Sequence, residues 1–323
     1  MKRRTRIPED SPKIFTGSSA NEDGKRRFGS FDEAVDAFLS DNLKRGLSAD
    51  TNHFYIGKLK AWRTYFETVA KTPPPIHPRS AQVDAYEDYL VSVKGLSING
   101  IKAHQRAIRR FYSYLIEVGA TNRNPFANRP RIKSQDIMIE TFTQTEIQRL
   151  LAVCNVSTFV GYRDYIMMNF MLDTGIRLRE MTDLNVGDVN LEDENVVILG
   201  KNRMRRVAPL SKSMVAMIKK WLIVRGESSS DRLFITQNDS NMSKRAVQNR
   251  LTIYGKKAGV YKQVSPHVFR HTFAKMYIQN GGNIFVLQDL LDHSTLDMVR
   301  RYVRLFSPDL KKDHALFSPL SKM

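Results

Sequence analysis

Residues 265–271 read SPHVFRH, and this stretch of the second half of the chain carries the strongest chemical signal. Ser265 suits the N-cap of a helix, and Pro266 fits its first turn. Arg270 follows His267 by three residues, so both side chains share one helix face near its start. A histidine exchanges protons near neutral pH, and an arginine binds two phosphate oxygens in a fork. The stretch therefore predicts a helix that presents a proton acceptor beside a phosphate-binding cation.

Four further motifs of the second half share this chemistry. They are TGIRLRE at 174–180, GKNR at 200–203, LLDHS at 290–294 and RY at 301–302. Each is a weak signal alone, because an arginine near a helix start is usually a surface residue and a lone histidine is more often structural. Their order along the chain makes them informative as a set.

Together the motifs resemble the catalytic signature of the tyrosine recombinase (phage integrase) family, which is Arg, Lys, His-x-x-Arg, His or Trp, then Tyr. The intervals between the matching residues are 24, 66, 3, 23 and 9, similar to those of simple two-domain Xer-type recombinases. The resemblance extends over about residues 30–310. The matching residues are Arg177, Lys201, His267, Arg270, His293 and Tyr302.

The resemblance implies that Tyr302 attacks a DNA phosphate, forms a 3′-phosphotyrosyl bond and releases a 5′-hydroxyl. His267 is the expected acceptor of the phenol proton, and Lys201 is the expected donor to the leaving oxygen. Arg177 and Arg270 are expected to stabilise the charge that develops on the phosphate. A 5′-hydroxyl of a partner strand then attacks the phosphotyrosyl bond.

Two further side chains are assigned by the same resemblance and spacing. His293 is expected to hydrogen-bond the scissile phosphate. Glu180 lies three residues after Arg177 and could orient histidine or arginine groups of the site, while a surface role is equally open.

We expect no cofactor and no metal. The covalent bond preserves the energy of the phosphodiester, and the sequence has neither a phosphate-binding P-loop motif nor the carboxylate cluster of a two-metal nuclease. His267 and His271 do have zinc-ligand spacing. However, Val268 stands where a zinc protease has glutamate, and Arg270 would repel a cation.

Two positions depart from the usual family pattern. Asp292 stands where a glycine usually precedes the second histidine, and a carboxylate there is repulsive to phosphate unless it turns away or pairs with a base. Asn202 replaces the second glycine of a G-K-G turn, and asparagine tolerates left-handed backbone angles better than most residues. The first departure puts the local geometry around His293 in question.

The pattern of elements predicts a mainly α fold with a small β-hairpin. Residues 1–28 are expected to be a basic disordered arm. Residues 29–128 read as an all-helical core-binding (SAM-like) DNA-binding domain, 129–140 as a linker and 141–323 as a mixed α+β catalytic domain with a C-terminal tail. Thr143 and Glu146 have the spacing of a capping box. Two β-branched runs around a polar turn predict the hairpin at 195–210.

The charge balance favours a nucleic-acid partner. The chain has 51 Lys and Arg against 33 Asp and Glu, and a pI near 9.9. Such a pI is typical of nucleic-acid binders, although basic proteins also bind membranes and acidic partners. Between residues 101 and 133 there are eight basic residues and one acid, Glu117. The expected DNA contacts are Lys102, Arg106, Arg109, Arg110, Arg203, Arg205, Arg206, Lys244 and Arg245.

The functional prediction is a site-specific DNA recombinase for integration, excision or resolution of a mobile element or replicon. Its expected partners are double-stranded DNA and other copies of the chain, as a tetramer on two DNA sites and a monomer or dimer when free. A related recombinase or an accessory DNA-bending protein are further candidates. The alternatives are a type IB topoisomerase-like relaxing enzyme and a catalytically inactive DNA-binding protein.

We expect the protein to be cytoplasmic and not to associate with a membrane. The most apolar stretch, 165–172, is too short to span a bilayer, and Cys154 is the single cysteine, so no intrachain disulfide can form.

Overall fold

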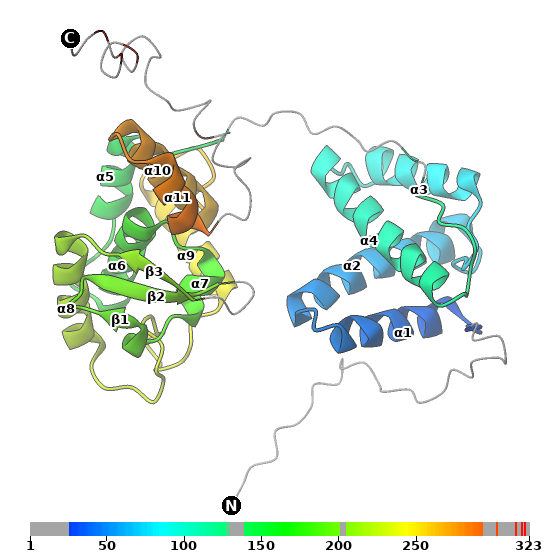
Figure 1. The fold of residues 1–323 in the computed structure, drawn as a ribbon, viewed down its shortest axis with the longest axis horizontal. Coiled ribbons are helices and arrows are strands. Elements are labelled where there is room, and N and C mark those ends of the chain that lie inside the picture. The colour runs from blue at the N-terminus through cyan, green and yellow to red at the C-terminus, as the bar shows by residue number, and fades with distance from the viewer. Residues whose placement is uncertain are drawn as a thin grey trace, which may run out of the picture. The chain divides into compact units, whose positions relative to one another are not determined.

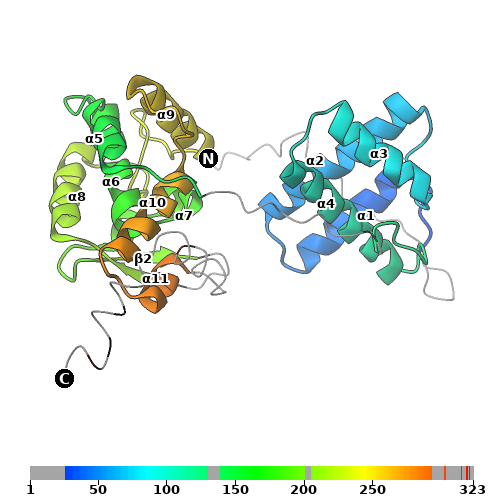
Figure 2. The same ribbon diagram turned by 90° about the horizontal axis from the view of Figure 1, so that it is seen from above.

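The computed structural model describes residues 26–127, 129, 139–200, 205–292, 302, 314, 318 and 320. The chain divides into two compact units, Met1–Ile137 and Met138–Met323 (Figures 1 and 2). Most of the predicted arm at 1–28 and of the predicted linker at 129–140 lies outside the described residues. The proposed boundaries of arm, domains and linker therefore stay a prediction.

Among its described residues, the first unit is built from four α-helices. They are α1 (Phe31–Lys44), α2 (Ala49–Tyr65), which continues as a π-helical turn (Phe66–Ala70), α3 (Ser80–Ser92) and α4 (Ile98–Glu117). The hydroxyls of Ser30, Ser48 and Ser97 accept backbone N–H bonds at the starts of α1, α2 and α4, which satisfies donors that a helix leaves unpaired. The all-helical character expected for this part of the chain is confirmed.

An aromatic cluster forms the core of the first unit. Trp62 is fully buried, with ring centroids 4.9 Å from Phe66, 4.8 Å from Tyr86 and 6.2 Å from Phe126. His104 Nδ1 lies 2.8 Å from the Tyr86 hydroxyl in the same interior. Burial lowers the pKa of His104 to about 4, with a further contribution from the charge of Lys58, so this histidine is neutral at physiological pH.

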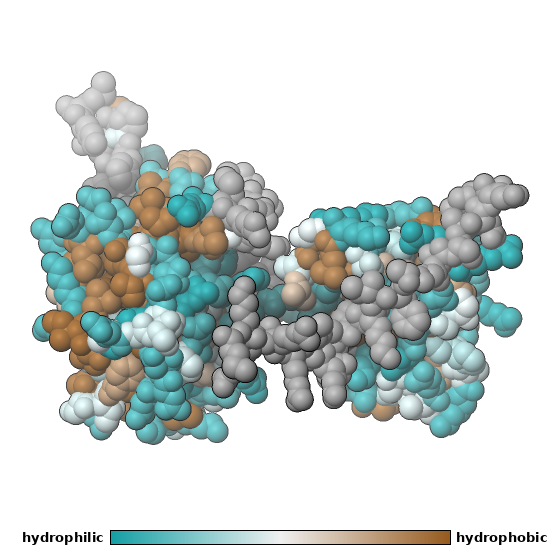
Figure 3. Space-filling view, turned by 90° about the horizontal axis from the view of Figure 1, so that it is seen from below, coloured by the Kyte–Doolittle hydropathy of each residue, from teal (hydrophilic) through white to brown (hydrophobic). Residues whose placement is uncertain are grey.

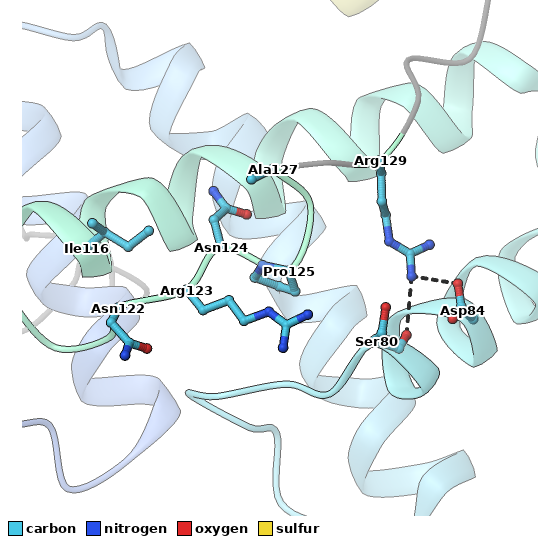
Figure 4. Close-up of a pocket in the computed structure, with 9 residues that line it drawn as sticks. All are labelled: Ser80, Asp84, Ile116, Asn122, Arg123, Asn124, Pro125, Ala127 and Arg129. Carbon is cyan, nitrogen blue, oxygen red and sulfur yellow. Dashed lines mark hydrogen bonds and ion pairs between the residues drawn. The ribbon is translucent and has the colours of Figure 1, made fainter.

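The chain leaves α4 across an open hollow of about 580 Å³ between the end of α4 and the start of α3 (Figure 4). Arg129 reaches over it to α3, with Nη2 2.5 Å from Asp84 Oδ1 and Nη1 2.7 Å from Glu87 Oε2. Arg129 Nη2 also donates to the backbone carbonyl of Ser80. These bonds fasten the segment after α4 to α3.

The second unit is mixed α+β, as expected. Its helices are α5 (Gln144–Ala152), α6 (Phe159–Thr174), α7 (Leu178–Asp183), α8 (Lys212–Arg225), α9 (Lys244–Lys257), α10 (Pro266–Gln279) and α11 (Ile284–Leu291). A 3₁₀ turn (Val186–Asp188) precedes an antiparallel sheet in the order β1 (Val189–Asn190), β2 (Asn195–Leu199), β3 (Arg205–Pro209). The predicted hairpin is the β2–β3 pair, in which Val197 faces Val207. Its turn at 201–204 lies outside the described residues.

The core of the second unit surrounds α6, whose buried side chains include Ile166, Met168 and Phe170. α6 packs against both α8 and α10, and the end of α11 lies beside β3 and α10 (Figure 1). The C-terminal ends of α6 and α11 and the N-terminal parts of α7 and α10 are thereby brought together.

The surface drawn in Figure 3 is largely hydrophilic, with separate apolar patches that are more extensive on the second unit. Exposed apolar side chains of that unit include Ile223 on α8 and Phe285 on α11. Among the helices that the structure describes, none combines the length and the apolar character needed to cross a bilayer.

Candidate active site

A tight turn between α6 and α7 places the first arginine. Gly175 ends α6 with a left-handed φ of 60°, and a Cβ at this position would lie 2.4 Å from Phe273 Cδ1. Only glycine fits both the backbone angle and the close approach of α10. The turn carries the chain to Arg177, which directly precedes α7 and whose N–H donates to Glu180 Oε2 at 3.1 Å.

Glu180 joins two arginines from different elements. Its Oε1 lies 2.8 Å from Arg177 Nη1, and its Oε2 lies 2.9 Å from Arg206 Nη2 on β3. The carboxyl is buried. Burial raises the pKa of Glu180, but the hydrogen bonds and charges of Arg206 and Arg177 outweigh this effect and hold it below its ordinary value. Of the two readings left open by the sequence, the structure therefore favours orientation of arginines over a surface role.

Arg270 on α10 ties the end of α6 to the end of α11. Its Nη1 donates to the carbonyl of Gly175 at 2.7 Å, and its Nη2 donates to the carbonyl of Leu291. The side chain is 5% exposed. Burial, followed by the charge of Arg177, lowers the pKa of Arg270 to about 10, so the guanidinium stays charged near neutral pH.

Asp292 also enters the site. It ends α11 with a left-handed φ of 48°, its Oδ2 lies 2.8 Å from Arg177 Nη1, and its backbone carbonyl accepts from Arg177 Nη2 at 2.7 Å. Burial lowers the pKa of Arg177, but Glu180 and Asp292 together raise it above its ordinary value. The carboxylate that replaces the usual glycine at position 292 thus pairs with a basic residue, Arg177.

Tyr302 is held in a small apolar cluster against α10 and α11. The side chain is 1% exposed and packs with Ala274, Ile278, Leu287 and Leu291. Its hydroxyl lies 2.6 Å from Nδ1 of His271, the residue that follows Arg270 on α10.

His267, the expected proton acceptor, lies one turn before His271 on α10 with its side chain exposed. His271 thus emerges as a candidate that the sequence reasoning considered only as a zinc ligand. The signal was present, since His271 ends the SPHVFRH stretch. Groups of three or more potential metal ligands are absent from the described part of the chain.

Three predicted residues, Lys201, Arg203 and His293, lie outside the described residues. Arg206 was expected to contact DNA phosphates, yet its side chain is 12% exposed and donates to Glu180 and to the carbonyl of Leu290. Of the other candidate DNA contacts in the second unit, Arg205, Lys244 and Arg245 are exposed. DNA contact by Arg206 stays a prediction, and its bonds to Glu180 and Leu290 place it among the arginines of the site.

The four basic residues of α4 differ in what they already bind. Arg109 Nε donates to the carbonyl of Phe126 at 3.2 Å, and Arg110 pairs with Glu117 at 2.7 Å. Arg106 is exposed, and its guanidinium lies 4.8 Å from the centre of the Phe54 ring. Lys102 is half-buried. Of these four residues, Arg106 is the best placed to meet a phosphate.

Comparison with known proteins decides the family. The model of the phage integrase family matches residues 140–307, more than half of the chain. The chain belongs to the phage integrase family. It is 27% identical over 294 residues to the tyrosine recombinase XerD of Shewanella oneidensis, covering 89% of this chain and 97% of that protein. It is 28% identical over 270 residues to the tyrosine recombinase XerC of Vibrio vulnificus, covering 81% and 83%.

A solved structure of the Tn1549 transposon integrase in complex with a circular intermediate DNA has a similar fold. The TM-score is 0.71 at 16% identity, and the match covers 90% of this chain and 99% of that one. This likeness concerns the fold and confirms the predicted combination of a mainly helical chain with a small sheet. The family predicted from the motifs is likewise confirmed.

Proposed function

We propose that this member of the phage integrase family cleaves and rejoins DNA through a covalent bond between Tyr302 and a 3′ phosphate. The chain is a site-specific recombinase of the tyrosine class, and the topoisomerase and inactive-scaffold alternatives are not favoured. The observation that supports the residue roles most directly is on α10. Arg270, whose guanidinium is close enough to Arg177 for their charges to interact, and His271, which contacts the Tyr302 hydroxyl, are adjacent there.

The proposed first step forms the bond between Tyr302 Oη and phosphorus and breaks the bond from phosphorus to the 5′ oxygen. The phenol proton passes to a histidine. The candidates for this proton acceptor are His267, expected from the sequence, and His271, which contacts the Tyr302 hydroxyl. Lys201 supplies a proton to the 5′ oxygen. Arg177, Arg270 and His293 bind the non-bridging oxygens, whose growing negative charge guanidinium groups stabilise. No ATP and no metal take part in this scheme.

The second step reverses the first on a different strand. A 5′-hydroxyl attacks phosphorus and gives its proton back to the amine of Lys201, the phosphotyrosyl bond breaks, and Tyr302 regains its proton from the histidine. Because Tyr302 is 1% exposed in the free chain, its hydroxyl can meet DNA only after the side chain leaves its apolar cluster. We therefore infer that the described state precedes cleavage.

Double-stranded DNA is the proposed substrate, held by the helical domain at 29–128 and the catalytic domain at 141–323. The net charge of +18 would make binding weaken steeply as salt displaces the protein from phosphates. We propose a tetramer on two DNA sites and a role in the cytoplasm in integration, excision or resolution of a mobile element or replicon. The solved relatives in complex with DNA support the choice of substrate.

Covalent trapping tests this function. Purified protein is incubated with nicked duplexes taken from both flanks of its own gene, without metal or ATP, and run on a denaturing gel beside Tyr302→Phe. We expect an adduct with the wild type that is absent with the variant, while both bind DNA equally. Plasmid relaxation without strand exchange between two sites would instead indicate a topoisomerase. Salt-sensitive binding with neither activity would contradict the proposal for these sites.

A further inference from the structure

The carboxyl end of α11 is bound by three arginines, one to each of three consecutive carbonyls. Arg206 donates to Leu290, Arg270 to Leu291 and Arg177 to Asp292. These carbonyls are the groups that a helix end leaves without intrahelical partners, and they carry its partial negative charge. The guanidinium groups that we assign to phosphate therefore already bind an internal, partly negative group.

Asp292 adds a full negative charge to this helix end. Its carboxylate and its carbonyl together engage Nη1 and Nη2 of Arg177. A two-point contact of this kind is what a phosphate would make with the same fork. Glu180 differs, since its side chain is 5% exposed against 43% for Asp292. Water and ligands therefore reach the Asp292 contact, whereas Glu180 stays within the site.

Stability alone explains Asp292 poorly. An ion pair as open to solvent as this one contributes little to the free energy of folding. Glycine also adopts the left-handed backbone at Asp292 more readily than aspartate does. Asp292 has a larger effect on the net charge of the site than on stability. Arg177, Arg206 and Arg270 face two carboxylates, so the group carries one net positive charge, and removing Asp292 would double it.

We propose that Asp292 is an internal competitor of the scissile phosphate at Arg177, and so a residue that restricts cleavage to DNA held firmly by the rest of the protein. The inference rests on the proposed function in assigning Arg177 to phosphate. Non-bridging oxygens must displace the carboxylate before Arg177 can support attack by Tyr302. DNA bound weakly or out of register fails to displace it and is not cut.

Inorganic phosphate serves as the first probe, because its binding does not require the DNA site to be known. A titration at constant ionic strength, followed by thermal shift, compares wild type with Asp292→Asn, which removes the charge while retaining a residue that tolerates the left-handed backbone. The control is Asp289→Asn, which removes an exposed carboxylate three residues earlier on α11. We expect the Asp292 variant to bind phosphate about fivefold more tightly, the size of one exposed ion pair, and the control to match wild type.

Adding Arg177→Ala to Asp292→Asn should abolish the gain, because the site of competition is then gone. Asp292→Gly, which also relieves the backbone, should bind phosphate as tightly as Asp292→Asn. An unchanged or weaker affinity in both Asp292 variants would overturn the proposal, as would an equal gain in Asp289→Asn or a gain that persists without Arg177.

A second arm uses nicked DNA. Asp292→Asn should form the phosphotyrosyl adduct on duplexes with substitutions flanking the cleavage position that the wild type leaves uncut. If the wild type forms adducts but the variant shows the same sequence tolerance, the role in selection is wrong. If neither protein forms an adduct while the phosphate gain is present and depends on Arg177, the proposed function fails and the competition at Arg177 remains.

Discussion

His271 Nδ1 lies 2.6 Å from the hydroxyl oxygen of Tyr302, and the two residues are separated by 31 positions in the chain. The bond joins α10, which also carries Arg270, to a tyrosine that packs within an apolar cluster. A phenol in such surroundings needs a polar partner, and a histidine can both hold its proton and accept it. His271 can therefore hold the hydroxyl of Tyr302 in the free protein, and it can accept the phenol proton on DNA if it stays in contact with Tyr302 as that side chain moves.

If His271 accepts the proton, His271→Ala should slow formation of the phosphotyrosyl adduct by about 10²- to 10⁴-fold, the usual contribution of a positioned base. His271→Asn keeps a hydrogen-bonding group near the Nδ1 position but cannot accept a proton near neutral pH. This variant should retain the thermal stability of the wild type and lose most of the rate of adduct formation. It should also lose the increase in rate that a histidine base gives as rising pH removes its proton. Rapid-quench measurement of adduct on a nicked duplex gives these rates.

His267→Ala is the matched variant, since His267 is the other candidate base on the same helix. A large loss of rate in His267→Ala, together with a normal rate and pH profile in His271→Asn, would assign the proton to His267. In that case the contact with His271 would serve only to hold Tyr302.

The turn at Gly175 should not tolerate a side chain. Gly175→Ala places a methyl group 2.4 Å from Phe273 Cδ1 at a positive φ, and it displaces the carbonyl that binds Arg270. We expect a loss of about 2–4 kcal/mol in the free energy of unfolding of the second unit, and a loss of adduct formation. Urea unfolding followed by Trp221 fluorescence, in a Trp62→Phe background, measures the first effect.

Gly187→Ala is the control for that measurement, because a Cβ at Gly187 meets no atom within 4 Å and its φ is not positive. It should change stability by less than about 0.5 kcal/mol. Equal stability of the two variants would show that the contact between the α6–α7 turn and α10 is looser than described.

Local features of the fold could be predicted from the sequence because neighbouring residues determine them. The Thr143 and Glu146 spacing forms both bonds of a capping box, and α10 begins at Pro266 after Ser265. β1 was missed, since two residues carry no alternation that could be read. The all-helical character expected for residues 29–128 also agrees with the helices of the first unit.

The partners within the site could not be predicted, because they depend on tertiary arrangement. Glu180 is three residues from Arg177, which spacing shows, but its second partner Arg206 lies on β3. Asp292 and Arg177 are 115 residues apart. Whether His267 or His271 faces Tyr302 depends on the rotation of α10 against α11, and no pattern within the SPHVFRH stretch determines it.

Substitutions at Arg106 and Arg109 should have different effects, the first on DNA binding and the second on stability. Arg106 is exposed and stacked on Phe54, so Arg106→Ala should weaken DNA binding and reduce the slope of log K against log salt by about one. Arg109→Ala removes the bond to the Phe126 carbonyl and should instead lower the free energy of unfolding by about 1–2 kcal/mol, with an unchanged slope. Fluorescence anisotropy with labelled duplex over a salt series, and urea unfolding, provide the two readouts. The reverse pattern would mean that Arg109 leaves Phe126 when DNA binds.

His104 should make the first unit sensitive to acid. Its pKa is lowered to about 4 by burial, whereas the unfolded chain binds the proton near pH 6.5. Between these values the unfolded state binds more protons than the folded state. Stability is therefore greatest above pH 6.5 and falls as the pH drops towards 4, by at most about 3 kcal/mol.

His104→Gln, which can still hydrogen-bond Tyr86 but does not titrate, should show a flatter dependence of stability on pH over this range. Unfolding of the full chain is followed by Trp62 fluorescence in a Trp221→Phe background, so that the signal reports the first unit. His53→Gln, an exposed histidine on α2, is the control and should keep the wild-type dependence. Because the two variants make the same substitution at a buried and at an exposed position, equal pH dependence in both would show that acid acts on the first unit through groups other than His104.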